Sequence, residues 1–380
     1  MRTYDQIIKE QEKRGFIERV AIDQTPFLGN GQAHYLPHHH IKKESSTTPN
    51  RIVYDCSCRM SSDYPSPNDC LEVGRPLIND LCSIILRFRI HKYGVSTDLE
   101  KAFLHVQLHH DDRDFTRFLW LSNPEDPESE FDTYRFKVVP FGATSSPFML
   151  NATLRLHLKN QDFEITEDIG KNLYVGSIIS GGAAEENVMQ YFRKARAIMS
   201  EAKFNLRSWA SNSPQLQAAV QEEKNADSNK IVNMLGLSWD LSTDRISFSP
   251  KPIDSTLDSG VTKRKVLQCS SRIFDPLGIL SPVTIHAKLL MQELWEKNID
   301  WDEPLEATMK DKWSSIVDSL QKASQVTISR QYFPLDNDSD KVQELHTFAD
   351  ASLKAYGAVV YIQYGSHTTF LIAKTRGCTT

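Results

Sequence analysis

The sequence predicts an α+β protein with antiparallel sheets, and three stretches support this prediction. In NLYVGSIISG, residues 172–181, two short apolar runs flank Gly176-Ser177, which is typical of a tight β-hairpin. The stretch that follows, EENVMQYFRKARAIMSEAKF, repeats its apolar residues with helical spacing. Residues 262–335 are predicted to be mostly helical, and the strand-like runs after them start a new sheet.

Composition limits the class of protein. The 380 residues are enough for two or three domains, and 40% hydrophobic with 24% charged residues is ordinary for a soluble globular protein. No apolar run approaches the roughly 18 residues of a membrane span. The polar, charged N-terminus is no secretory signal, so the six cysteines are expected to be reduced thiols. A net charge of −5 argues against a wholly basic nucleic-acid binder but allows a local basic groove.

The N-terminal part is predicted to begin with an amphipathic helix over residues 3–20, where isoleucines and Phe16 recur among charges. The run RIVYDCS is typical of a strand, and the Ser/Pro/Asp-rich SSDYPSPND is typical of a loop. Apolar residues on one side then predict a helix over residues 75–92.

The central part alternates strands and helices. A strand ends in YGVSTDLEKAF, and TYRFKVVPFG predicts another. The next helix is expected to start at Ser146 as its N-cap, with Pro147 in the first helical position. Beyond the Gly176-Ser177 hairpin and its helix, VNMLGLSWDLSTDRISF predicts a second hairpin with Asp244 near its turn.

Taken singly, the polar motifs are ambiguous. Asp98 at a strand end would be an N-cap or loop residue more often than a catalytic acid. Three consecutive histidines, His38–His40, cannot all face one metal ion from one strand, so a metal site is disfavoured there. Ser145-Ser146 is a helix start rather than a nucleophile, because no His-Asp pattern supports hydrolase chemistry.

The order of the motifs is more specific than any one of them. A basic strand pair precedes Asp98, a PFGATSSPF turn into a helix follows it, and the hairpin, a further helix and LGLSW come next. In this order the chain resembles the reverse transcriptase region of BEL/Pao-type retrotransposon polyproteins. The resemblance spans nearly all 380 residues and includes LRFRIHKYGVSTDLEKAFLHVQL, IFDPLGILSPVTIHAKLLMQELW and HTFADASLKAYGAVVY.

The resemblance implies a right-hand polymerase fold, with fingers, a palm built on an antiparallel sheet, and a helical thumb or connection. The expected segments are 1–95 for the N-terminal helix and fingers, 96–245 for the palm with the remaining fingers, 246–340 for the thumb or connection, and 341–380 for a truncated RNase H-like start. The expected location is the cytoplasm, with the nucleus or retroelement particles as alternatives and no membrane partner. The oligomeric state stays open.

The implied activity is RNA-directed DNA polymerisation, in which dNTPs are added to a primer–template with two Mg²⁺ (or Mn²⁺) ions. Mg²⁺ prefers hard oxygen ligands, and the family supplies carboxylates from two neighbouring palm elements. Asp98 matches the first carboxylate. The second belongs to a Tyr-Val-Asp-Asp or Tyr-Val-Asp-Asn box, which here reads Tyr174-Val175-Gly176-Ser177. Because charge neutralisation is most of this catalysis, little or no polymerase activity is expected.

The other positions that match the family are contacts to the incoming nucleotide. Without the resemblance they would be ordinary surface charges, a core phenylalanine and a structural turn. Basic residues would hold the triphosphate, an aromatic gate would exclude the ribose 2′-hydroxyl, and a turn would pack on the nucleotide. These positions are Lys42, Lys43, Arg51, Phe103, Phe141 and Gly142.

Two further matches lie toward the C-terminus. Leu235, Gly236 and Trp239 match the hairpin that grips the primer, although a hairpin with glycine is commonly just structural. Asp350 in FADAS matches the first metal carboxylate of an RNase H site. The remaining acids of such a site would lie beyond the given sequence, so Asp350 is predicted to be vestigial and RNase H activity is not expected. Residues 341–380 are expected to pack on the thumb or to fray.

Two alternatives to an impaired polymerase stay open. The chain could be a non-catalytic remnant that still binds primer–template through Arg and Lys phosphate contacts. It could also be a decayed retroelement fragment with no selected role. Gly176 and Ser177 are each one A-to-G codon change from Asp and Asn, so decay, adenosine deamination or a sequencing error would each explain them.

Overall fold

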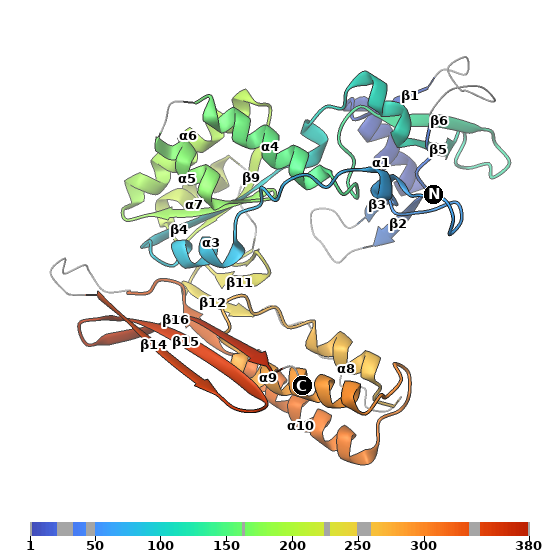
Figure 1. Cartoon of the computed structure of the whole chain (residues 1–380). Coiled ribbons are helices and arrows are strands. Elements are labelled where there is room, and N and C mark those ends of the chain that lie inside the picture. Colours follow the sequence, from blue (N-terminus) through green and yellow to red (C-terminus); the bar gives the residue numbers. More distant parts are fainter. Residues whose placement is uncertain are drawn as a thin grey trace. The chain divides into compact units, whose positions relative to one another are not determined.

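The chain divides into two compact units, each assembled from segments that are far apart in the sequence. Unit 1 contains Met1–Ile78, Leu99–Gly176 and Lys194–Leu206, and unit 2 contains Asn79–Asp98, Ser177–Arg193 and Arg207–Thr380. The four consecutive segments predicted from the sequence stay a prediction beside this division. The structure, a computed structural model, describes residues 2–20, 33–42, 50–161, 164–223, 229–248, 260–333 and 343–378 (Figure 1).

Unit 1 combines small antiparallel sheets with helices. Strands β1, β6 and β5 form a sheet in that order, and β2 pairs with β3. Buried aromatic and aliphatic side chains from these strands and from α1 share one core. The elements are α1 (Arg2–Lys13), β1 (Ile17–Arg19), β2 (His38–Lys42), β3 (Asn50–Tyr54), α2 (Pro67–Cys70), the 3₁₀ helices η2 (Ala102–His105) and η3 (His110–Thr116), β5 (Arg117–Leu121), β6 (Phe131–Phe136), α4 (Ser146–Lys159), α5 (Glu164–Asn172) and β7 (Leu173–Tyr174).

The helix predicted over residues 3–20 is wrong in its second half. Helix α1 ends at Lys13, and Gly15 then adopts a φ of +75°, which the right-handed helix does not allow. Phe16 and Ile17 enter the core, and Ile17 pairs with Phe136 in the β1–β6 ladder. The apolar spacing misled the prediction because these two residues are buried whether the chain is helical or extended.

His38 attaches strand β2 to the core of unit 1. Its Nε2–H donates to the carbonyl oxygen of Leu119 at 2.8 Å, so Nδ1 is left to accept the hydroxyl of Tyr4. Burial lowers the pKa of His38 from its usual 6.5, and burial raises the pKa of Tyr4. The neutral imidazole and the protonated phenol are therefore the forms that the fold requires.

This arrangement predicts a pH dependence of stability. Because the folded pKa of His38 lies below the unfolded value, the stabilisation is present above about pH 6.5 and is lost as the pH falls through the folded pKa. His38→Gln, whose amide keeps a donor and an acceptor without titrating, should lose less stability than the unchanged chain between pH 7.5 and pH 5. Urea unfolding at both pH values measures this difference. Equal losses in the two proteins would contradict the prediction.

Unit 2 holds the sheet in which β4 lies between β8 and β9, the sheet β10-β11-β12-β13 and the sheet β14-β15-β16. The boundary between the units falls inside β4, α6 and β9. The elements are α3 (Leu81–Phe88), β4 (Tyr93–Leu99), β8 (Ser177–Gly182), α6 (Glu185–Glu201), β9 (Leu206–Ser211), α7 (Pro214–Glu222), β10 (Ile231–Met234), β11 (Leu237–Asp240), β12 (Arg245–Phe248), α8 (Lys263–Ser270), α9 (Ser281–Glu296), α10 (Ala307–Ala323), β13 (Thr327–Ser329), β14 (Gln343–Ala351), β15 (Ala355–Tyr364) and β16 (His367–Gly377).

Two predicted elements of unit 2 differ from the structure. The helix expected over residues 75–92 is the shorter α3, which begins where the Asp80 carboxylate accepts the backbone N–H of Ser83 at 2.7 Å. The predicted second hairpin is a three-strand meander, because one turn lies between β10 and β11 and another, with Asp244 at a φ of 52°, lies between β11 and β12.

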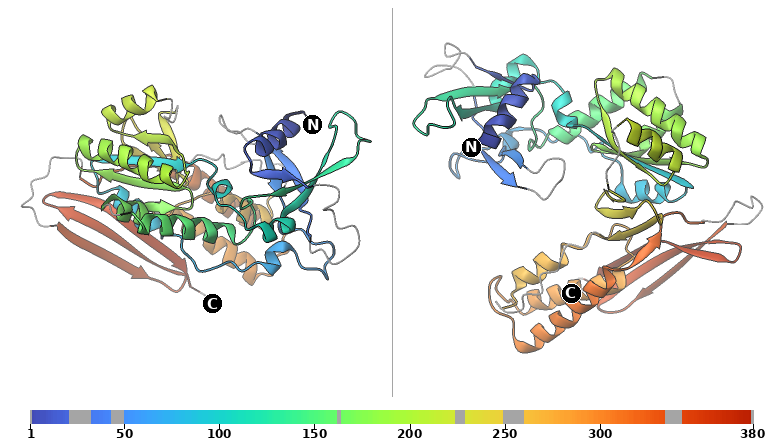
Figure 2. Two further views of the ribbon diagram at one scale, coloured as in Figure 1. Left: turned by 90° about the horizontal axis from the view of Figure 1, so that it is seen from above. Right: turned by 180° about the vertical axis from the view of Figure 1, so that it is seen from behind.

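The C-terminal strands pack against helix α9 (Figure 2). The backbone N–H of Ala373 in β16 donates to the carbonyl oxygen of Leu277 at 2.8 Å, and Gln292 of α9 donates to the carbonyl oxygen of Cys378 at 2.8 Å. Residues 341–380 were expected either to pack or to fray, and the described residues 343–378 are packed. None of the helices in the described part of the chain is long and apolar enough to cross a membrane.

Candidate active site

Asp98 and Ser177 lie opposite each other in the antiparallel β4–β8 pair of unit 2. The side chain of Asp98 is exposed and that of Ser177 is half-buried. The Ser177 hydroxyl donates to Asp98 Oδ1, with 2.6 Å between the two oxygens. The strand pairing therefore brings the two predicted site residues into direct contact, and a neutral hydroxyl group faces the carboxylate.

The turn before Ser177 lies one residue earlier than predicted. It consists of Val175 and Gly176, and Ser177 is already the first residue of β8. Val175, a β-branched residue, has a φ of 54°, a conformation that such side chains rarely adopt. The Gly176 carbonyl accepts the backbone N–H of Leu99 at 2.7 Å. Sequence reasoning placed the left-handed residue at glycine, whereas the structure puts it at valine.

Gly176 has space for a side chain. Its φ lies outside the left-handed region, and a Cβ added to it would lie 3.6 Å from the Cβ of Ala102, which is an ordinary van der Waals contact. The glycine is therefore not required by the backbone at this position. Local geometry would accept an aspartate there, the residue that the resemblance implies.

The residues at this strand end do not fit a pair of Mg²⁺ ions. Two-metal nucleotidyl transfer needs carboxylates that bridge both ions. Asp98 supplies one carboxylate, Gly176 supplies no side chain, and the Ser177 hydroxyl group donates its proton to Asp98. In the described part of this strand end, Asp98 therefore faces a hydroxyl group and not a second carboxylate.

In unit 1 the structure brings together the aromatic residues predicted to contact the nucleotide. The rings of Phe103 and Phe141 meet edge to face, with centroids 5.1 Å apart, and Phe141 is 47% exposed. Gly142 has a φ of +98°, and a Cβ there would lie 2.9 Å from the backbone oxygen of Tyr54. This turn therefore requires glycine, in contrast to Gly176.

The basic residues predicted for the triphosphate lie on the β2–β3 pair. Lys42 pairs in register with Asn50, Arg51 pairs with Ile41, and both basic side chains are exposed. Lys43 lies outside the described residues. Exposed basic groups on a two-stranded ribbon are compatible with the predicted role but do not assign it.

The predicted primer-grip residues divide into two kinds. Leu235 and Gly236 form the tight β10–β11 turn with φ values of 48° and 87°. Trp239 is completely buried, its ring packs edge to face on Phe88, and its indole N–H donates to Asp244 at 2.9 Å. Trp239 is therefore a core residue that holds the hairpin, and its predicted part in a primer grip stays a prediction.

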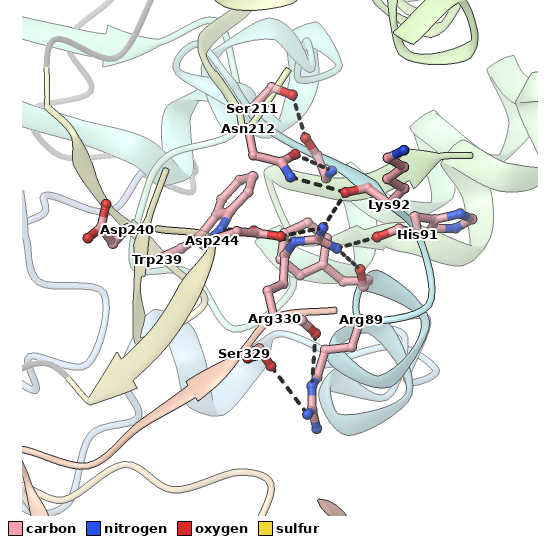
Figure 3. A network of polar contacts seen from close by, with 12 residues as sticks. Arg89, His91, Lys92, Ser211, Asn212, Trp239, Asp240, Asp244, Ser329 and Arg330 are labelled. Atoms are coloured by element: carbon pink, nitrogen blue, oxygen red, sulfur yellow. Dashed lines mark hydrogen bonds and ion pairs between the residues drawn. The ribbon is translucent and has the colours of Figure 1, made fainter. Parts of the chain in front are cut away.

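A buried arginine network fixes this hairpin, and sequence reasoning missed it (Figure 3). The guanidinium of Arg330, 0% exposed, donates to both carboxylate oxygens of Asp244 at 2.7 and 2.8 Å. It also donates to the carbonyl oxygens of Phe88, His91 and Lys92 at the end of α3. No motif marks Arg330 in the sequence, because its partners come from distant segments.

Asp350, the predicted RNase H carboxylate, lies in the exposed strand β14 opposite Gly357. Its carboxylate accepts the backbone N–H of Ala351 at 2.9 Å. Asp350 also lines a hollow of about 530 Å³ between the sheet and the start of α9, and it is the only acidic residue among the described residues of that lining.

Comparisons with known proteins place this architecture. Residues 262–378 match the family described as "Pao retrotransposon-like RNaseH-like domain", so the match includes helices α8–α10 as well as the C-terminal sheet. No curated protein matches the chain by sequence. The matched residues begin before residue 341, and the predicted start of the RNase H-like segment at that residue stays a prediction.

Solved structures of the foamy viral protease–reverse transcriptase share the fold. A form called dRH in complex with double-stranded DNA has a TM-score of 0.63 at 15% identity, the complex with an RNA/DNA hybrid has 0.61 at 15%, and a further complex with double-stranded DNA has 0.60 at 16%. Each match covers 99% of this chain but only 55%, 43% and 66% of the respective viral chains. The chain therefore shares the fold of these viral proteins, and residues 262–378 match the Pao RNaseH-like family model, so the predicted resemblance to a Pao-type retrotransposon region is confirmed.

Proposed function

We propose that the chain descends from an RNA-directed DNA polymerase and that this copy has little or no polymerase activity. One observation carries the proposal: the residue that faces Asp98 across the β4–β8 pair is a serine that donates to it, and the preceding residue is a glycine. Asp98 would therefore be the one carboxylate left at this strand pair to hold metal ions. The ions that neutralise the charge of the phosphoryl transfer would then lack part of their ligands.

Binding of a primer–template is proposed to outlast catalysis. The surfaces that would contact nucleic acid do not include Gly176 or Ser177. Lys42 and Arg51 remain exposed on the β2–β3 ribbon, and Phe141 remains exposed beside Phe103. Cationic and aromatic groups of this kind bind phosphates and bases without a metal ion. The remnant that binds without extending is therefore favoured over the decayed fragment.

The proposal predicts binding without extension. A labelled primer–template should bind the chain with an affinity that falls steeply as salt rises, because cationic contacts release counterions. With dNTPs and Mg²⁺ or Mn²⁺, extension should not exceed that of Asp98→Asn, the matched control that removes the predicted metal carboxylate of the polymerase site. Fluorescence anisotropy and gel-resolved extension measure the two quantities.

Extension well above the Asp98→Asn level would overturn the proposed inactivity. Absence of primer–template binding by the folded chain would instead favour the decayed fragment. For Asp350, we propose a vestigial metal carboxylate, because the hollow beside it contains no other acidic residue in the described lining. Cleavage of an RNA/DNA hybrid by the chain would contradict that assignment.

A further inference from the structure

The C-terminal sheet of unit 2 has no buried core of its own. None of the described side chains of residues 343–378 is buried, and Leu345 and Phe348 of β14 are 65% and 59% exposed. Strand β16 packs against α9, and β14 lies at the opposite edge of the sheet. A three-stranded sheet is stable when other elements cover an apolar face. The stability of this sheet therefore depends on how firmly β16 is attached to the rest of unit 2.

One buried side chain attaches β16 to the end of α3. Arg89, the residue after α3, is 1% exposed, and its guanidinium donates to the carbonyl oxygen of Phe370 in β16 at 3.0 Å. The same guanidinium donates to the carbonyl oxygen of Arg330 at 3.1 Å and lies 4.2 Å from the centre of the Tyr332 ring. The Thr369 hydroxyl donates to the Tyr332 carbonyl oxygen at 2.9 Å. Arg89 thus joins the end of α3, the segment after β13 and strand β16.

Arg89 and Arg330 hold each other's segments, but only one of them is paired with an acid. Arg330 donates to three carbonyl oxygens beside Arg89 and to both carboxylate oxygens of Asp244 (Figure 3). Among the described residues, the hydrogen-bond acceptors of Arg89 are carbonyl oxygens, and no carboxylate pairs with it. Burial lowers the pKa of Arg89. Because a buried charge without a carboxylate loses much of its hydration, the attachment through Arg89 should open more easily than the Arg330–Asp244 pair.

We infer that Arg89 attaches the C-terminal sheet to unit 2, and that β14, β15 and β16 detach and redock together while the β4–β8 pair stays folded. Two neutral hydrogen bonds, at Ala373 and Cys378, also hold this sheet, whereas Arg89 supplies the charged donor. Detachment removes no buried side chain of the sheet from a core, so its cost is low. The α3 end keeps its place meanwhile, because Arg330 and Asp244 hold it independently.

Hydrogen exchange of the full chain, read by mass spectrometry of peptides, tests the inference. In the unchanged chain the peptides of β14, β15 and β16 should share one protection factor, at least about 10-fold below that of β4 and β8. In Arg89→Met the protection of all three strands should fall by at least about 10-fold more, because the carbonyl oxygens lose a charged donor. The protection of β4 and β8 should stay the same.

Two further variants locate the effect. Arg376→Met makes the same chemical change at an exposed position of β16 and should leave every protection factor unchanged. Thr369→Val keeps the shape of the side chain but removes its donor to Tyr332, so it should lower the protection of the three strands about 2- to 10-fold. This variant decides the test where Arg89→Met fails to fold.

Three results would overturn the inference. The first is protection of the C-terminal strands equal to that of β4 and β8 in the unchanged chain. The second is unchanged protection in Thr369→Val and in a folded Arg89→Met. The third is a loss of protection that spreads equally to β4 and β8, or that stays within a single strand of the sheet, because the three strands would then not detach together.

Discussion

Replacing Gly176 by Asp and Ser177 by Asn is expected to raise primer extension by at least about 100-fold over the unchanged chain, because it restores a carboxylate to the β7–β8 turn next to Asp98. The backbone is ready for this change. The φ of Gly176 lies outside the left-handed region that favours glycine. The new Cβ would lie 3.6 Å from the Cβ of Ala102, an ordinary van der Waals contact. Single-nucleotide extension rates with Mg²⁺ and with Mn²⁺ measure the gain.

The matched control is Gly176→Asn with Ser177→Asn. It has the same shape as the repaired turn without its negative charge, so it should extend no better than the unchanged chain. Primer–template affinity and the unfolding midpoint should be similar in all three proteins, since the change is local and partly exposed. Equal extension by the Asn control, or no gain in a repaired protein that binds and folds normally, would refute the assignment of the turn.

Arg330→Met is expected to destabilise unit 2 by about 3–5 kcal/mol, the usual cost of removing one partner from a buried ion pair. The change leaves the Asp244 carboxylate without the guanidinium at 2.7 Å and leaves three carbonyl oxygens at the end of α3 without their donors. Trp239 donates to the same Asp244, so its fluorescence reports the loss. Urea unfolding followed by tryptophan emission measures the effect.

Arg245→Met is the control on the same hairpin. Arg245 is exposed and donates to Thr327 across the β12–β13 pair, so its loss should cost about 1 kcal/mol or less. Combining Arg330→Met with Asp244→Asn should cost little more than Arg330→Met alone, because the two residues act as one unit. A fully additive double variant, or equal costs for Arg330 and Arg245, would contradict the role given to the network.

The sequence predicted local features well where one chemical requirement decides them. Gly142 and Gly236 were expected in turns, and both have positive φ values with close neighbours. The motif order predicted that Asp98 and the Gly176-Ser177 box lie together, and the structure pairs Asp98 with Ser177 across β4 and β8. The exact turn did not follow, since nothing in the sequence shows that Val175 takes the left-handed conformation.

Features that depend on distant partners could not be predicted. Trp239 matched a hairpin by sequence, but its burial depends on the ring of Phe88, which is far away in the chain. Its hydrogen bond to nearby Asp244 completes the arrangement. Arg330 lies in a stretch without a motif and meets its partners only when the chain folds. The spacing of apolar residues also gave a wrong helix around Phe16. Phe16 is buried in the core, and burial alone does not distinguish a helix from a strand.

The space for a side chain at Gly176 affects how long an altered copy of such a retroelement protein persists in the cell. Glycine in place of the acid at this turn creates neither a steric clash nor backbone strain, so the stability of the fold should not change. The altered protein should then escape degradation and accumulate as readily as an intact one. If it also retains its grip on primer–template, it would occupy substrates that active copies need. A defect confined to two side chains would then act on the whole population of elements as an inhibitor.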